Sequence, residues 1–106
     1  MIELTKENFE QEVTEHKGVV FIDFWSPKCE KCLELFPEVE ALAQRNAGKA
    51  KFCKLDAAAN RRLSIAQKVM GLPAFVLYLD GERKFMFDAG TIDMDAIQSK
   101  LDELAG

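Results

Sequence analysis

The hydrophobic pattern of the chain first indicates several β-strands. Residues Val19–Trp25 read VVFIDFW and are apolar except for Asp23. A run this rich in β-branched and aromatic residues is typical of a strand covered on both faces. Two shorter runs, Ile2–Leu4 and Ala50–Leu55, predict further strands. The stretch AFVLYL-DG-ERKFMF predicts a hairpin, because the pair Asp80–Gly81 suits a type I′ turn, in which both central residues have positive φ.

Capping residues predict two short helices. Thr5 is expected to cap the first, which carries Phe9 and Val13 on one face and ends before Gly18. Asn60 is expected to cap the second, and Gly71 to terminate it.

Apolar residues at helical spacing predict two longer helices. The first should follow a turn at Ser26–Lys28 and run to about Asn46, through Pro37, with an apolar face formed by Leu33, Phe36, Val39 and Ala43. Asp93 is expected to cap the second, whose apolar stripe comprises Met94, Ile97, Leu101 and Leu104.

The resulting order is β-α-β-α-β-α-β-β-α. Strands joined by helical crossovers are parallel, and a hairpin adds an antiparallel edge. We therefore expect one α/β domain over residues 1–106, with a mixed five-stranded sheet and four helices distributed over both of its faces.

Composition narrows the functional classes. The 106 residues carry a net charge of −4, from 14 basic and 18 acidic side chains, without a basic patch of the kind that binds nucleic acid or anionic membranes. No run approaches the roughly 18 apolar residues of a membrane span, and no signal peptide is visible. Three cysteines are too few for a secreted disulfide framework, so a cytoplasmic protein is expected, without nucleic-acid or membrane partners.

The candidate chemistry lies in the motif WSPKCEKC, where Cys29 and Cys32 are three positions apart. Cys29 falls where strand gives way to helix, and a helix N-terminus favours the nucleophilic thiolate. Cys32, one turn further and facing the sheet, should be more buried and within reach of the first sulfur. This asymmetry suits a dithiol reductant in which Cys29 attacks a disulfide and Cys32 resolves the mixed disulfide.

Two other uses of the same pair remain open at this point. Zinc usually has four N or S ligands, and neither Cys53, inside a strand, nor His16, the only histidine, is placed to complete a site, so no metal is expected. The thiols could also be inert core residues, as is expected for Cys53.

Several separated motifs decide between these readings. IDFW, a CxxC pair, a proline five residues after it, CKLD, GLPAF, LDGE and DAG occur in the order and spacing of thioredoxins. The chain resembles that family over essentially its whole length. The resemblance implies the thioredoxin fold and a redox-active Cys29–Cys32 pair that needs no other cofactor.

The resemblance also implies roles for single residues. Asp23 matches a buried carboxylate that takes the proton of Cys32, and Lys54 matches a lysine that lies beside it and tunes its pKa. Pro73 matches a cis-proline opposite the dithiol. Leu72 would pair with an extended substrate segment through its backbone, and Gly90 would border the same groove.

The motif departs from the family around the two cysteines. Trp25 is expected to pack beside the active-site turn, but Lys28 replaces the usual second tryptophan, and Glu30 and Lys31 replace glycine and proline. The family pattern implies a thioredoxin-reductase-type flavoprotein and disulfide-bearing clients as partners of a monomer, and the charged rim is expected to change which of them dock. A more oxidising, glutaredoxin-like or isomerase-like exchange protein and a redox-incidental interaction module are the alternatives.

Overall fold

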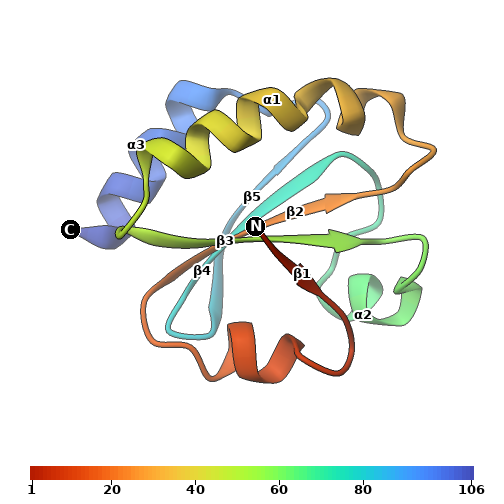
Figure 1. Cartoon of the computed structure of the whole chain (residues 1–106), viewed down its shortest axis with the longest axis horizontal. Coiled ribbons are helices and arrows are strands. Elements are labelled where there is room, and N and C mark those ends of the chain that lie inside the picture. The colour runs from red at the N-terminus through yellow and green to blue at the C-terminus, as the bar shows by residue number, and fades with distance from the viewer.

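The computed structural model describes residues 1–106, in which the predicted order of elements is confirmed (Figure 1). The five strands are β1 (Ile2–Leu4), β2 (Val19–Trp25), β3 (Ala50–Asp56), β4 (Ala74–Leu79) and β5 (Glu82–Asp88). The helices are the short π-helix η1 (Glu10–Thr14), α1 (Glu30–Arg45), α2 (Arg61–Ala66) and α3 (Met94–Ala105).

The strands form one mixed sheet in the order β1-β3-β2-β4-β5. β1, β3 and β2 are parallel to one another, whereas β4 runs antiparallel to both β2 and β5. β2 is the central strand and hence is buried along almost its whole length, which explains its nearly continuous apolar sequence. Asp23 is the one charged residue in this strand.

Two apolar cores lie on the two faces of the sheet. On one face, η1 and α2 cover a cluster that includes Leu4, Phe9 and Val13, so the apolar face predicted for the first helix is confirmed. On the opposite face, α1 and α3 cover a cluster that includes Phe21, Phe75 and Ile97 (Figure 1). Alternate residues of β2 therefore point toward opposite helical layers.

The apolar face predicted for α1 is partly wrong. Leu33 is 43% exposed, whereas Cys32, Leu35, Val39 and Leu42 are buried. The two sets are spaced almost equally along a helix, so periodicity alone could not choose between them. The direction in which the chain leaves β2 sets the rotation of α1, and it points Cys32 inward.

Of two predicted chain reversals, the hairpin turn is confirmed and the end of α2 is wrong. Asp80 and Gly81 have φ of 52° and 84°, which confirms the predicted type I′ geometry. The end of α2 is different from the prediction: it closes at Lys68, with φ of 67°, and not at Gly71. The amides of Lys68 and Val69 donate to the carbonyls of Ile65 and Ser64, which completes a Schellman motif without glycine.

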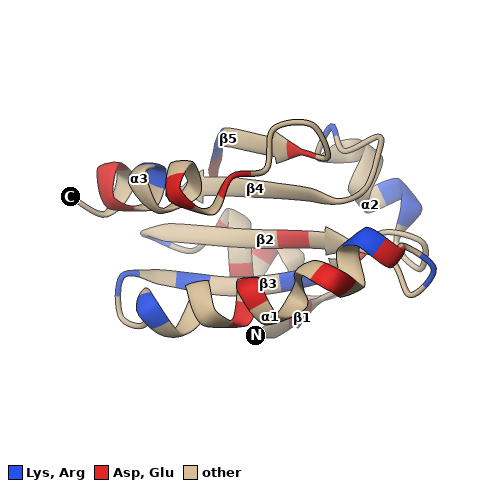
Figure 2. Ribbon diagram, turned by 90° about the horizontal axis from the view of Figure 1, so that it is seen from above, with Lys and Arg blue, Asp and Glu red and all other residues tan.

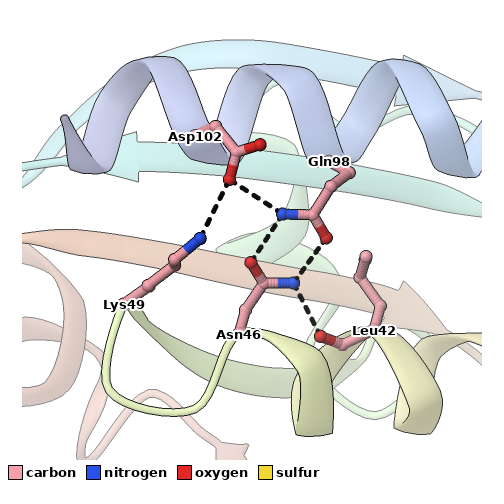
Figure 3. A network of polar contacts seen from close by, with 5 residues as sticks. All are labelled: Leu42, Asn46, Lys49, Gln98 and Asp102. Carbon is pink, nitrogen blue, oxygen red and sulfur yellow. Dashed lines mark hydrogen bonds and ion pairs between the residues drawn. The ribbon is translucent and has the colours of Figure 1, made fainter.

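A polar network joins the C-terminal half of α1 to α3 (Figure 3). Asn46 is fully buried and exchanges two hydrogen bonds with Gln98, each 2.8 Å long, while it also donates to the carbonyl of Leu42. Gln98 and Lys49 both donate to the carboxylate of Asp102. The network fixes the far end of α1, opposite the end that carries the two cysteines.

No helix in the structure combines the length and hydropathy that a membrane span requires.

Candidate active site

The turn between β2 and α1 places the first cysteine. Ser26 is buried, its hydroxyl accepts the amide of Lys28, and its carbonyl accepts the amide of Cys29 at 3.0 Å. Such a serine turn reverses the chain directly after the strand. The sequence predicted only a turn at Ser26, although a serine two residues before Lys28 is a recognisable signal for this geometry.

Cys29 and Cys32 form a disulfide across the first turn of α1. Cys29 is the N-cap residue of the helix, and its Sγ accepts the amide of Cys32 at 3.2 Å. Cys29 remains partly exposed, whereas Cys32 is only 1% exposed. A partner molecule can therefore approach Cys29 but not Cys32.

Asp23 is buried beneath α1. It is 1% exposed, and its Oδ1 atom has no hydrogen-bond partner. It lies on the α1 side of the sheet, because Phe21, two positions away, and Phe75, directly opposite on β4, both belong to that core. Burial raises the pKa of Asp23 from 3.8 to about 7, while the charge of Lys54 acts in the opposite direction and lowers it.

Lys54 occupies the position on β3 that pairs with Asp23 on β2. Its ammonium lies 5.7 Å from the ring centroid of Trp25, in a cation–π contact. Trp25 also packs edge-on against Phe36 of α1, with ring centroids 5.2 Å apart. The tryptophan therefore lies between the lysine and the helix, as expected of a residue packed beside the turn.

The Leu72–Pro73 peptide bond is cis, as the resemblance implied. Leu72, Pro73 and Gly90 line one hollow, together with residues of β5 and the segment before β4. The amide of Gly90 donates to Asp88 Oδ1, and the same carboxylate accepts the Thr91 hydroxyl, which holds this loop against the end of β5. Trp25 and Lys28 do not line this hollow.

Cys53 is completely buried in the core on the η1 and α2 side of the sheet, as expected from the sequence. Burial raises the pKa of its thiol to about 12, so it stays protonated at neutral pH. No group of three or more His, Cys, Asp or Glu side chains is arranged to hold a metal ion.

Comparisons with known proteins agree with this geometry. The family model described as thioredoxin matches residues 1–103. A thioredoxin of Acetoanaerobium sticklandii is 42% identical over 83 residues, which are 78% of this chain and 79% of that protein. Protein disulfide-isomerase A3 of Gallus gallus is 35% identical over 106 residues, all of this chain and 21% of that one. A solved mutant thioredoxin from Halobacterium salinarum superposes with a TM-score of 0.86 at 30% identity, over 99% of this chain and 90% of its own.

Proposed function

Because the chain belongs to the thioredoxin family and is a thiol–disulfide oxidoreductase, we propose that it reduces disulfides of client proteins, with Cys29 as the nucleophile. The observation that carries this proposal is the unequal exposure of the two cysteines: Cys29 is partly exposed at the start of α1, and Cys32 is buried. A client disulfide reaches Cys29 first, so Cys32 is left as the resolving thiol.

The reaction takes place in two exchanges. The Cys29 thiolate attacks one client sulfur, the client disulfide breaks, and one client thiolate leaves as a mixed disulfide forms. The Cys32 thiol then loses its proton and attacks Cys29 Sγ, which releases the second client thiol. Two electrons pass from the dithiol to the client, and the Cys29–Cys32 disulfide remains.

Asp23 is the proposed proton acceptor for Cys32. Both side chains are buried on the same side of the sheet, where bulk water cannot easily take the proton. A carboxylate with a pKa of about 7 exists in both forms at neutral pH, which suits proton transfer in either direction. Lys54 is proposed to keep this pKa from rising further, through its charge.

Client segments are proposed to lie across the hollow at Pro73. The Leu72 backbone would pair with the extended client chain, and Gly90 would allow it to approach closely. Lys28 and Trp25 would contribute to the rim on the other side of Cys29.

The expected partners follow from the same proposal. A thioredoxin-reductase-type flavoprotein would return the Cys29–Cys32 disulfide to the dithiol, and no metal or further cofactor is required by the exchange. We propose that the chain acts as a single domain and a monomer in the cytoplasm.

An insulin reduction assay tests the proposal. With dithiothreitol as the electron source, the protein should accelerate the precipitation of insulin chains, and Cys29→Ser should abolish the acceleration. Cys53→Ser is the matched control and should retain it. A wild-type protein that does not accelerate insulin reduction contradicts the proposed function.

The likeness to protein disulfide-isomerase A3 favours one second candidate, an isomerase-like exchange protein. The two functions differ in the reduction potential of the Cys29–Cys32 pair. Equilibration with glutathione distinguishes them: a pair that glutathione reduces at cytosolic ratios has a high reduction potential and supports the isomerase-like function, whereas a pair that stays oxidised supports the reductase.

A further inference from the structure

A second hollow lies on the other side of the segment that leads to Pro73. It has a volume of about 410 Å³ and extends from Ser26, at the end of β2, to Leu72. Arg61 and Ile65 of α2 line it, together with Val69 and Met70 of the segment that follows. Because Ser26 belongs to the turn that holds Cys29, this hollow directly adjoins the proposed reaction site.

Exposed apolar side chains are concentrated at this hollow. Ile65 is 51% exposed and Met70 is 82% exposed, and both line it. Met70 also lines the hollow at Pro73, so its side chain lies on the ridge between the two. Large apolar side chains left in water beside a reactive group indicate a surface that a partner covers.

The one charged side chain that lines the hollow is positive, although the chain as a whole carries a net charge of −4. Arg61 is its only ionisable lining residue, and its guanidinium makes no ion pair or side-chain hydrogen bond. Lys and Arg appear on α2, and a basic residue appears next to acidic ones at the beginning of α1, at the end of the molecule toward which β2 points (Figure 2). An unpaired guanidinium at the edge of an apolar hollow is suited to a carboxylate that follows an apolar side chain.

We propose that this hollow selects clients: it binds an apolar side chain of the client segment near the reactive cysteine, and Arg61 pairs with an adjacent Asp or Glu. The preferred substrates are therefore disulfides flanked by an acidic and an apolar residue. This inference rests on the proposed disulfide reduction, and it adds a specificity that the family motifs do not carry, because it depends on Arg61, Ile65 and Met70.

Matched peptide substrates test the proposal. Three disulfide-linked peptides would each carry a leucine near the cysteine. They would differ only at the position next to that leucine, which is Glu, Gln or Lys. Reduction of each is measured as kcat/KM at low and high salt, with hydroxyethyl disulfide as a small neutral substrate. The wild-type protein should prefer the Glu peptide over the Lys peptide by about fivefold at low salt, and high salt should reduce this preference.

Two charge reversals at neighbouring positions separate a local contact from bulk charge. Arg61→Glu should invert the preference, whereas Arg62→Glu, next to it but outside the hollow, should leave it in place. Replacing the peptide leucine by serine should lower kcat/KM for the wild-type protein. The same replacement should lower kcat/KM less for the variant Ile65→Ser. All three variants should reduce hydroxyethyl disulfide at the wild-type rate.

The outcomes distinguish the inference from the proposed function. Equal wild-type rates on the three peptides, or inversion by Arg62→Glu as strong as by Arg61→Glu, overturns the inference while disulfide reduction stands. A wild-type protein that reduces neither the peptides nor hydroxyethyl disulfide overturns the proposed function itself.

Discussion

Asp23 and Lys54 occupy paired positions on neighbouring parallel strands, yet no ion pair joins them. The lysine ammonium lies over the Trp25 ring instead, and the carboxylate remains buried with one oxygen unpartnered. A structural ion pair would hold the pKa of Asp23 low, whereas this arrangement allows burial to raise it to about 7. The carboxyl group is thereby kept close to its point of half-protonation at neutral pH.

Asp23→Asn should stabilise the oxidised protein at neutral and higher pH. The raised pKa means that folding favours the protonated form of Asp23. The contribution of this carboxyl group to the free energy of unfolding is therefore fully present below pH 3.8 and is lost as the pH rises through about 7. Because each pKa unit corresponds to about 1.4 kcal/mol, the neutral amide should gain about 4 kcal/mol above pH 7.

Denaturant unfolding from pH 4 to pH 8 measures this difference, which should nearly vanish at the acidic end. Asp102→Asn provides a control of opposite sign, because hydrogen bonds from Gln98 and Lys49 lower the pKa of that exposed carboxylate. A stability difference between Asp23→Asn and wild type that does not change with pH would contradict the assignment.

Lys54→Met should raise the pKa of Asp23 above its wild-type value. Lys54 supplies the charge that opposes burial, and methionine keeps a similar apolar length without that charge. The titration of the Asp23 carboxyl carbon, followed by NMR, measures the effect directly. Lys51→Met on the same strand is the control, because Lys51 pairs with Glu12 and does not act on Asp23. The hypothesis fails if both variants shift the titration equally.

In the reduced protein, Cys29 should react with iodoacetamide much faster than Cys32 at neutral pH. Cys29 is partly exposed at the helix start, whereas Cys32 is 1% exposed. Cys53 should not react, because it is buried and its pKa is about 12. Mass spectrometry of proteolytic fragments over time gives the order. Faster labelling of Cys32 would reverse the assigned roles, and Cys32→Ser should trap mixed disulfides with clients.

Lys68→Gly should stabilise the fold by about 1 kcal/mol, because Lys68 adopts the left-handed conformation that favours glycine. Gly81→Ala supplies the opposite case: its φ is 84°, and a Cβ atom there would meet the backbone carbonyl of Thr14. Thermal unfolding should show a higher Tm for the first variant and a lower one for the second. A lower Tm for Lys68→Gly would mean that the lysine side chain stabilises the turn by more than its backbone strain costs.

The sequence predicted those parts of the molecule that local chemistry determines. The order of elements, the hairpin at Asp80–Gly81 and the cap at Asp93 each depend on residues that are neighbours in the chain, and the structure contains all three. The roles of Asp23, Lys54 and Pro73 came from the family motifs and not from the residues alone, since their proximity depends on the order of strands in the sheet.

What could not be predicted depends on three-dimensional placement. The rotation of α1 that exposes Leu33 and buries Leu35 is set by the turn at Ser26 and by packing on the sheet. The hollow beside Arg61 is formed by segments far apart in sequence, and nothing in the pattern of α2 shows that Ile65 faces solvent. The cation–π contact of Lys54 could not be predicted, because it depends on where the Trp25 ring lies on the neighbouring strand.

The hydrogen bond from the Cys32 amide to Cys29 Sγ makes the nucleophile also the cap of its own helix. The capping atom is a disulfide sulfur in one state of the protein and a thiol or thiolate in another, and these accept hydrogen bonds with different strength. Folding and reduction form a closed thermodynamic cycle. If the oxidised and the reduced protein differ in their free energy of folding, the free energy of reducing the disulfide therefore differs by the same amount between the folded and the unfolded chain. The opening turn of α1 therefore helps to set how readily this protein gives up electrons. Substitutions at Glu30 and Lys31 can adjust that property while the sheet stays unchanged.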